Sequence, residues 1–422
     1  MHTADVDFVV VGGGVLGLSA AHALARRGHE VIVCEQATVG HATSGSKGSA
    51  RIFRLGYDEP GYVRLAMLAL GLWRRLEAES RSTLLTTTGQ VTFGDDLDML
   101  VAALAEAGAP HATITSDEVT ARFPALSPQG PAVFEPESAV IAADDCLAVL
   151  RRTDGIELRE RTRVVGCLDG GGAVRLSLES PDGADELRAS VVVVCAGPWT
   201  APLVSGRPVG LRPMATLEQV AYLAPTAATA GATVAGAPVA GATVDGLPVF
   251  VERRRPWFYG LPVRSSGLMK VALHGGGPAV SLEDLDGRRN GHGDRDDDVA
   301  REDDVDREDA VDRPDPGLVA QLTEAARRVL PGLVPEPVAT ERCVYDNSAD
   351  GNFVLDRIGG VVIGAGTSGH GFKFAPLLGE LLADLATGAD HHRELGRPDD
   401  LAPFSLARLR SSGGTGGPTI HR

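Results

Sequence analysis

The N-terminal segment contains two short apolar runs separated by a stretch with helical periodicity. Residues 8–11 are uniformly apolar, which is typical of a strand buried on both faces of a parallel sheet. Apolar positions then recur at helical spacing from Leu16 to Leu24, and Gly28 ends that helix. Residues 30–33 have the pattern of a second strand. The segment is therefore predicted to form a β-α-β unit.

The turn between the first strand and the helix carries Gly12, Gly14 and Gly17 at the G-x-G-x-x-G spacing of a dinucleotide site. The first glycine permits a tight turn, the second lets the backbone approach a pyrophosphate, and the third lets helix and strand pack closely. A pyrophosphate would bind the free N–H groups at the positive end of the helix. Glu35 ends the second strand, where an acid accepts hydrogen bonds from an adenosine ribose and argues against NADP.

Similar patterns predict the elements of the rest of the chain. An amphipathic helix is expected over residues 62–77, and strands on both sides of a turn at Gly89. Residues 191–194 and 360–365 are further buried-strand patterns, and the latter precedes a glycine-rich turn and a helix. Residues 249–274 alternate like antiparallel strands. The expected fold is α/β (α+β): a Rossmann-like dinucleotide-binding domain with a second, antiparallel-sheet domain for substrate and catalysis.

Both domains are expected to be discontinuous in sequence. The dinucleotide-binding domain is assigned residues 1–85, 145–215 and 335–392, and the substrate domain residues 86–144 and 216–334. Residues 283–316 are acidic and lack aromatic residues, so this insertion is predicted to be disordered. The polar, glycine-rich tail at residues 405–422 is predicted to be disordered as well.

Length and charge narrow the classes of function. The 422 residues are enough for two domains, and the net charge of −16 argues against nucleic acid or an anionic membrane surface as a partner. No apolar run approaches the ~20 residues of a membrane-spanning helix, and the N-terminus lacks the features of a leader. The five cysteines have no paired spacing, which suits a reducing compartment. We expect a cytoplasmic protein without a metal site, as a monomer or weak homo-oligomer.

Several cationic residues are candidates for anion recognition. Arg51 and Arg54 follow the nucleotide unit; on a short helical stretch they would share one face, where they could bind a cofactor phosphate and a substrate carboxylate. A solvated basic turn is the alternative. Lys270 lies between apolar neighbours in an expected strand, either on the exposed face or buried with a function. Lys373 follows Gly371 at the start of the last helix, where the dipole disfavours a cation, which indicates an anionic partner nearby.

These elements occur in the order of a known family. The motifs are the nucleotide fingerprint, GSKGSARIFR, CAGPW, FYGLP followed by Lys270 and His274, the Cys343-x-Tyr345 element, and GTSGHGFKF. From about residue 5 to residue 385, interrupted only by the acidic insertion, the sequence resembles the monomeric sarcosine oxidase and N-methyltryptophan oxidase group, within the larger D-amino-acid-oxidase-like flavoproteins.

The resemblance implies FAD rather than NAD, attached covalently by a thioether from Cys343 to the 8-methyl carbon of the isoalloxazine. It implies that Lys270 activates dioxygen and that Arg54 and Lys373 bind the substrate carboxylate. The other implied site residues are Arg51 near the flavin ring, Gly369 and Gly371 beside the cofactor, and Tyr259, Tyr345, His274 and Phe250 around the substrate. Lys47 and Phe250 depart from residues of sarcosine-oxidising members, so sarcosine itself is in doubt while the chemistry is not.

The implied function is oxidation of a secondary amino acid, N-methyl or cyclic, to an imine, with dioxygen reduced to hydrogen peroxide. The expected partners are therefore a small amino acid and dioxygen. An FAD-dependent dehydrogenase that uses another electron acceptor is the main alternative. A catalytically silent FAD-binding protein and an NAD-dependent dehydrogenase are the other two.

Overall fold

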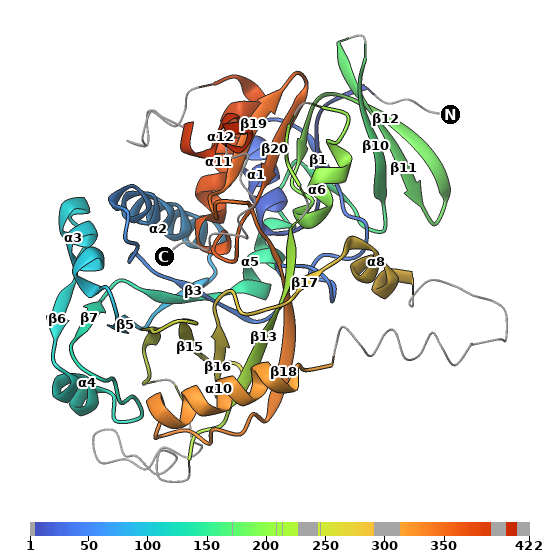
Figure 1. Cartoon of the computed structure of the whole chain (residues 1–422). Helices are drawn as coiled ribbons and strands as arrows, with labels where there is room; N and C mark the ends of the chain where they lie inside the picture. Colours follow the sequence, from blue (N-terminus) through green and yellow to red (C-terminus); the bar gives the residue numbers. More distant parts are fainter. Residues whose placement is uncertain are drawn as a thin grey trace, which may run out of the picture.

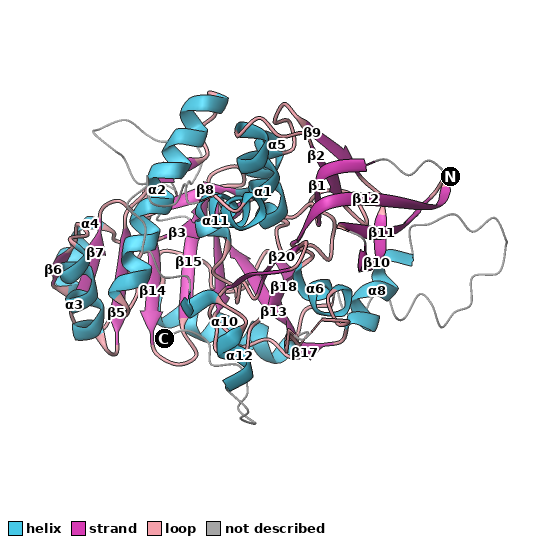
Figure 2. Cartoon of the chain, turned by 90° about the horizontal axis from the view of Figure 1, so that it is seen from above, coloured by secondary structure: helices cyan, strands magenta, loops and turns pink. Residues whose placement is uncertain are grey.

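Two large sheets and a small third one form the framework of the molecule (Figures 1 and 2). The computed structural model describes residues 5–170, 172–207, 209–212, 214–226, 244, 246–290, 313–389 and 402–411. In this part of the chain one sheet has eight strands and the second has nine. The expected combination of a Rossmann-like domain with a second, largely antiparallel sheet is confirmed.

The central strands of the first sheet are parallel and are buried on both faces, as is typical of parallel sheets. Val10 and Val193 pair in register, and neither side chain is exposed to solvent. The parallel strands are β1 (Asp5–Val11), β2 (Val31–Cys34), β9 (Ile156–Arg159), β12 (Gly183–Val194) and β20 (Val361–Ala365). The antiparallel additions are β10 (Arg163–Gly170), β11 (Ala173–Ser180) and β19 (Val354–Ile358).

Helices α1 (Val15–Arg26) and α11 (Ala375–Thr387) pack closely against each other beside this sheet (Figure 1). A Cβ at Gly379 would lie 2.5 Å from the carbonyl group of Ser19, so only glycine permits this approach. A Cβ at Gly17 would lie 2.0 Å from the carbonyl oxygen of Gly12. The packing role predicted for Gly17 is therefore confirmed. Helices α2 (Pro60–Ser80), which matches the expected amphipathic helix, and α5 (Ala143–Leu150) complete the same core.

The second sheet is antiparallel except where β14 pairs with β5, and its strands alternate between a core face and a face toward the first domain. Helix α10 (Pro316–Val329) packs on β13 and β16. The strands are β5 (Gln90–Gly94), β6 (Ala112–Ile114), β7 (Ala132–Glu135), β13 (Ala215–Leu223), β14 (Val249–Arg253), β15 (Phe258–Val263), β16 (Leu268–Leu273), β17 (Ala279–Val280) and β18 (Ala339–Asp346).

Strand β18 differs from the expected domain boundaries. Its sequence falls in the segment 335–392 that was assigned to the dinucleotide-binding domain, but it pairs with β13 along its whole length, from Ala339 opposite Tyr222 to Asp346 opposite Ala215. The second sheet, and not the first, therefore carries Cys343 and Tyr345. Strand order in a sheet depends on long-range pairing, which the local pattern of the sequence does not contain.

The small third sheet has the order β3 (Ala50–Phe53), β8 (Ala139–Ala142) and β4 (Leu85–Thr87). The two strands expected around Gly89 thus belong to different sheets, because β4 joins β8 while β5 joins β7 and β14. The remaining helices are α3 (Leu97–Ala107), α4 (Ser116–Arg122), α6 (Thr200–Leu203) and the 3-10 turns η1 (Gly197–Trp199) and η2 (Phe372–Phe374).

Two segments expected to be disordered are ordered in part. Helix α8 (Leu282–Asn290) begins the acidic insertion; Leu285 is buried against β13 and β18, and Asp286 accepts a hydrogen bond of 2.7 Å from the indole of Trp199. In the tail, α12 (Ala407–Ser411) is anchored by an ion pair between Arg408 and Asp350, and the 3-10 turn η4 (Ala402–Phe404) lies just before the tail. In both cases a few buried side chains anchor an otherwise polar segment. The rest of both predictions, residues 291–312 and 412–422, lies outside the described residues.

None of the helices that the structure describes is long and apolar enough to cross a bilayer.

A buried carboxylate at the end of β7 joins the third sheet to the second. Glu135 is fully buried, and burial raises the pKa of its carboxyl group. It accepts hydrogen bonds from five donors: the backbone N–H groups of Leu55 and Gly56, the amide of Gln90, and the hydroxyl groups of Ser138 and Thr92. Glu135 therefore holds the chain that leaves β3, which includes Arg54.

We predict that Glu135→Ala lowers the free energy of unfolding by about 3 kcal/mol or more, because several buried donors lose their acceptor. Glu135→Gln should cost much less. The amide introduced by this substitution carries no charge, so no charge has to be desolvated. The buried Oε1 of Gln90 has no partner among the described residues, and it can accept a hydrogen bond from the new amide if the amide of Gln90 rotates. Urea unfolding of the three proteins measures the difference; equal losses for both variants would contradict this account.

Candidate active site

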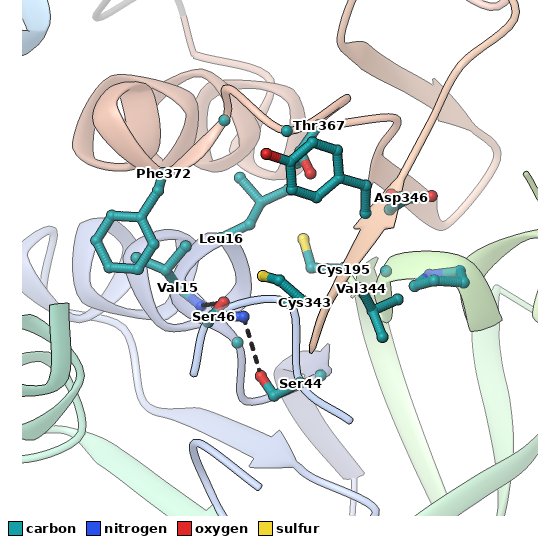
Figure 3. A pocket seen from close by; sticks show the side chains of 18 of the residues that line it. Val15, Leu16, Ser44, Ser46, Cys195, Cys343, Val344, Asp346, Thr367 and Phe372 are labelled. Atoms are coloured by element: carbon teal, nitrogen blue, oxygen red, sulfur yellow. Dashed lines mark hydrogen bonds between the residues drawn. The ribbon is translucent and has the colours of Figure 1, made fainter. Parts of the chain in front are cut away.

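One cavity of ≈ 390 Å³ lies between the two large sheets. Figure 3 shows Cys343, Ser46 and Phe372 among the side chains around it. The structure brings nearly all of the predicted site residues to this cavity: Gly12, Gly14, Glu35, Arg51, Arg54, Tyr259, Lys270, His274, Cys343, Tyr345, Gly369, Gly371 and Lys373. Gly17 does not line it, because it lies behind Gly12 at the packing contact described above.

One end of the cavity is built from the turn between β1 and α1. Gly12 has a φ of 107°, and a Cβ there would lie 2.4 Å from the carbonyl oxygen of Cys195. Gly14 is the N-cap of α1 and leaves the end of the helix without a side-chain cap. Glu35 lies at the end of β2, where its carboxylate accepts a 2.7 Å hydrogen bond from the N–H group of Gly13. A helix start whose N-cap residue has no side chain, beside a buried acid, fits the pyrophosphate and ribose of a dinucleotide.

Sequence reasoning missed Ser46 at this end. Its hydroxyl oxygen accepts a 2.9 Å hydrogen bond from the N–H group of Val15, in the first turn of α1 (Figure 3). The loop after β2 therefore reaches back over the start of the helix. A serine in a loop rich in Gly and Ser has no local pattern that would reveal this long-range contact.

Arg51 lies beside Cys343 and is not part of a solvated turn. Its guanidinium donates hydrogen bonds to the carbonyl oxygens of Lys47 and Gly45, at 2.5 and 3.2 Å, and to the Cys343 sulfur at 3.9 Å. It also lies 5.6 Å from the ring centroid of Phe372. The prediction of a helical stretch is wrong, since residues 50–53 form strand β3. Backbone carbonyl groups thus fix the guanidinium of Arg51, and this guanidinium contacts the sulfur of Cys343 at the cavity wall.

Lys270 takes the buried alternative of the two that the sequence left open. It lies in the middle of β16, and only 4% of it is exposed. Burial, and then the positive charge of Arg51, lower its pKa to about 8, although the carboxylate of Glu341 acts in the opposite direction. At neutral pH this lysine is a mostly protonated ammonium group inside the protein.

Arg54 and Lys373 both lie close to the ring of one tyrosine, Tyr57. The guanidinium of Arg54 lies 4.3 Å and the ammonium of Lys373 lies 5.7 Å from the ring centroid of Tyr57. Arg54 donates to the carbonyl oxygen of Gly56, and Lys373 donates to that of His370 at 3.2 Å. Burial, together with the charge of Arg54, holds the pKa of Lys373 well below its usual value.

Lys373 occupies the 3-10 turn η2, one turn before α11 itself. Among the residues that the structure describes, neither Arg54 nor Lys373 forms an ion pair with a carboxylate. The half-buried Arg54 and the buried Lys373 are neighbouring cations in a cavity and form a site for an anion, because an anion offsets their repulsion and the desolvation of the lysine.

Aromatic side chains from the second sheet face the same space. The hydroxyl groups of Tyr259 and Tyr345 lie 3.5 Å apart, and burial raises the pKa of Tyr259 to about 12, so both keep their protons at neutral pH. The ring of His274 lies 6.1 Å from that of Tyr345 and 6.4 Å from that of Trp257, centroid to centroid. Sequence reasoning missed Trp257, which precedes the FYGLP motif.

The expectation for Phe250 is wrong. This side chain is 1% exposed and packs among Phe93 and Phe258 in the core of the second domain. Its neighbour Val251 lines the cavity instead. Successive residues of a strand point to opposite faces, so an error of one position in the matching of motifs moves a side chain from the site to the core.

In the described part of the chain, no group of three or more His, Cys, Asp and Glu side chains is placed to hold a metal ion.

Comparison with known proteins agrees with this geometry. Residues 7–385 match the family model described as FAD dependent oxidoreductase. The chain is 31% identical over 424 residues to peroxisomal sarcosine oxidase of Homo sapiens, covering 96% of this chain and 97% of that protein. It is 26% identical over 431 residues to N-methyl-L-tryptophan oxidase of Yersinia pestis (strain Pestoides F), covering 96% of this chain and all of that protein.

Among solved structures, glycine oxidase from Geobacillus kaustophilus superposes with a TM-score of 0.72 and 21% identity, covering 96% of this chain and 99% of that chain. The glycine cradle at Gly12, the open helix end at Gly14 and the buried acid Glu35 fit the adenosine diphosphate half of FAD. The chain belongs to the FAD-dependent oxidoreductase family, and FAD is its cofactor.

Proposed function

We propose that this protein oxidises a secondary amino acid, N-methyl or cyclic, to an imine and transfers the electrons to dioxygen, which becomes hydrogen peroxide. The observation that carries the proposal is the pair of neighbouring cations, Arg54 and Lys373, in the cavity that Lys270 and Cys343 also line. The names of the two relatives, a sarcosine oxidase and an N-methyl-L-tryptophan oxidase, support the same substrate class.

In this proposal the substrate carboxylate binds between Arg54 and Lys373. A bidentate contact with the guanidinium fixes the orientation of the carboxylate and thereby the carbon that reacts. Bound FAD supplies the two-electron oxidation at the carbon next to the amine. The protein binds the amine in a cavity whose nearby donors, Tyr259 and Tyr345, remain protonated. The amine must be neutral to react, so the rate should rise with pH through the ionisation of the bound substrate.

Lys270 distinguishes the oxidase from the alternative dehydrogenase. Dioxygen acquires negative charge as it is reduced, and a fixed ammonium group in a buried site favours that charge. A dehydrogenase that passes electrons to another acceptor has no use for such a group. We therefore favour the oxidase. A silent FAD-binding protein would have no need for the side chains of Arg54, Lys270, Cys343 and Lys373 in one cavity. The match to an FAD-dependent family argues against NAD as the cofactor.

We further propose that Cys343 binds the flavin covalently. Its sulfur would replace a hydrogen of the 8-methyl carbon, and the two electrons and two protons released would pass to dioxygen. The contact from Arg51, 3.9 Å from this sulfur, supports a fixed position at the cavity wall. A cytoplasmic location and a monomer or weak homo-oligomer complete the proposal.

Acid precipitation tests the covalent bond. We predict that the precipitated wild-type protein stays yellow and that Cys343→Ser releases its flavin, because only the thiol forms the thioether. Cys195→Ser is the matched control, since this second buried cysteine also lines the cavity and should leave the flavin attached. Release of free flavin from the wild type would contradict the linkage.

The role of Lys270 is tested by separating the two half-reactions. Lys270→Met should slow the reaction of the reduced enzyme with dioxygen by about 10²-fold or more, which is the effect of losing one preorganised electrostatic group. Anaerobic reduction by substrate should suffer much less. Lys270→Arg keeps the charge and should retain more oxygen reactivity than the methionine variant. Equal slowing of both half-reactions would remove Lys270 from oxygen activation.

The carboxylate site, and with it the proposed function, is tested by a panel of secondary amino acids with peroxide detection. Each is compared with its methyl ester and its decarboxylated amine, which we expect to be poor substrates. Arg54→Lys and Lys373→Met should each raise the apparent Kd of the amino acid by ~10-fold or more, the effect of one charge-assisted hydrogen bond. Acetate should compete in the parent enzyme and much less in either variant. Equal rates for an ester and its amino acid would exclude the amino-acid proposal.

A further inference from the structure

We propose that Glu341, held by Tyr222, is a positioning residue that supplies the negative charge needed to keep Lys270 protonated. This inference rests on the proposed function, in which the ammonium group of Lys270 serves the reaction with dioxygen. The sequence motifs did not include either residue.

The register of the second sheet places these side chains on one face. Tyr222 of β13 pairs directly with Lys270 of β16 on one side. On the other side of β13, Glu341 of β18 pairs with Val220, which is two residues from Tyr222 and therefore points to the same face. Three adjacent strands thus bring the lysine, the tyrosine and the carboxylate together.

The contacts agree with the register. The hydroxyl group of Tyr222 donates a hydrogen bond of 2.5 Å to Oε2 of Glu341, and its ring centroid lies 5.8 Å from Nζ of Lys270. A Cβ built on Gly48 would lie 3.1 Å from Oε1 of Glu341 and 3.8 Å from Nζ of Lys270. The free carboxylate oxygen and the ammonium group therefore face the same point beside Gly48.

The other carboxylate oxygen is the unusual one. Oε1 of Glu341 is buried and has no hydrogen-bond partner among the described residues. A buried unsatisfied acceptor costs free energy unless a nearby charge compensates it. The tyrosine fixes Oε2 and so directs Oε1 toward the cations, at the cost of leaving it without a hydrogen bond of its own.

The charges around Lys270 show why one carboxylate matters. Arg51 from β3 and Lys47 from the preceding loop repel the ammonium group, while the carboxylate of Glu341 from β18 acts in the opposite direction. A Cys343 thiolate would act in the same direction as Glu341, but the proposed thioether carries no charge. The neutral phenol of Tyr222 completes the surroundings from β13. Burial opposes ionisation of Glu341, yet Lys270, Tyr222, Lys47 and Arg51 together hold the pKa of its carboxyl group below the usual value. Glu341 is thus ionised at neutral pH.

The consequence concerns the protonation of Lys270 in the working pH range. With Glu341 present, the pKa of Lys270 is about 8. An opposite charge this close shifts a pKa by roughly 1–3 units. Without the carboxylate, the pKa of Lys270 would fall to neutrality or below, so less of this lysine would carry a positive charge at pH 7. A neutral amine cannot stabilise the charge that develops on dioxygen.

The first measurement is the pH dependence of the reaction between reduced enzyme and dioxygen. The wild-type rate should fall as pH rises through about 8. Glu341→Gln should move this midpoint down by about one unit or more. Glu341→Asp keeps the charge and should restore most of the shift, while Tyr222→Phe should give a smaller shift than Glu341→Gln. Glu252→Gln is the control. It removes a buried carboxylate of β14 that pairs with Arg328 of α10, and it should leave the midpoint unchanged.

The second measurement does not depend on activity. The pKa of Lys270 is lower in the folded protein than in the unfolded chain, so the unfolded chain binds more protons between about pH 8 and the usual lysine value, and stability rises with pH over that interval. The difference in unfolding free energy between wild type and Lys270→Met should follow this rise. In the Glu341→Gln background, the same difference should begin to rise at a lower pH.

The two measurements separate the inference from the proposed function. A shift in the stability curves without a shift in the oxygen reaction would support the role of Glu341 and overturn the role of Lys270. Unchanged stability curves in the Glu341→Gln background would overturn the inference, whatever happens to activity, because the carboxylate would then serve only Arg51 and Lys47.

Discussion

The arrangement of the site follows from the cost of burying positive charge. Arg51, Arg54, Lys270 and Lys373 all line one cavity, where burial and a neighbouring arginine lower the pKa of both lysines. The groups that surround the positive charge differ from one residue to the next. Backbone carbonyl groups hold Arg51, and the ring of Tyr57 lies close to Arg54 and Lys373. Glu341 faces Lys270. In the proposed chemistry, the positive charges of Arg54 and Lys373 bind the substrate carboxylate, and the positive charge of Lys270 stabilises the negative charge that develops on dioxygen.

The second sheet is the element that aligns the catalytic face. Strand β13 is its centre, because it pairs with β16 on one side and with β18 on the other. Lys270 thereby comes close to Cys343, although long stretches of sequence separate them. Glu135 performs the corresponding task for Arg54, since it ties the chain after β3 to this sheet. The first domain supplies the nucleotide site and Lys373, and the second sheet supplies Lys270, Cys343 and Tyr345.

The sequence by itself determined the features that depend on neighbouring residues. The glycine spacing with Gly12, Gly14 and Gly17 and the apolar run of β1 specified the nucleotide unit, because its turn, helix start and strand are local structures. The resemblance in motif order indicated the family, and most of the site residues that it implied do line the cavity. It failed for Phe250, where one position decides between the two faces of a strand.

Only the tertiary structure decided which distant residues meet. The burial of Lys270, the sheet to which β18 belongs, and the anchoring of α8 by Leu285 all depend on pairing and packing between distant segments. The same holds for the partners of Arg51, which lies in a strand where a helix was expected. Glu341 lies two residues before Cys343 and therefore on the same face of its strand, but the sequence could not reveal that Lys270 would lie opposite. Local patterns determine the secondary structure of a segment, whereas pairing between distant strands determines which charged side chains meet at the site.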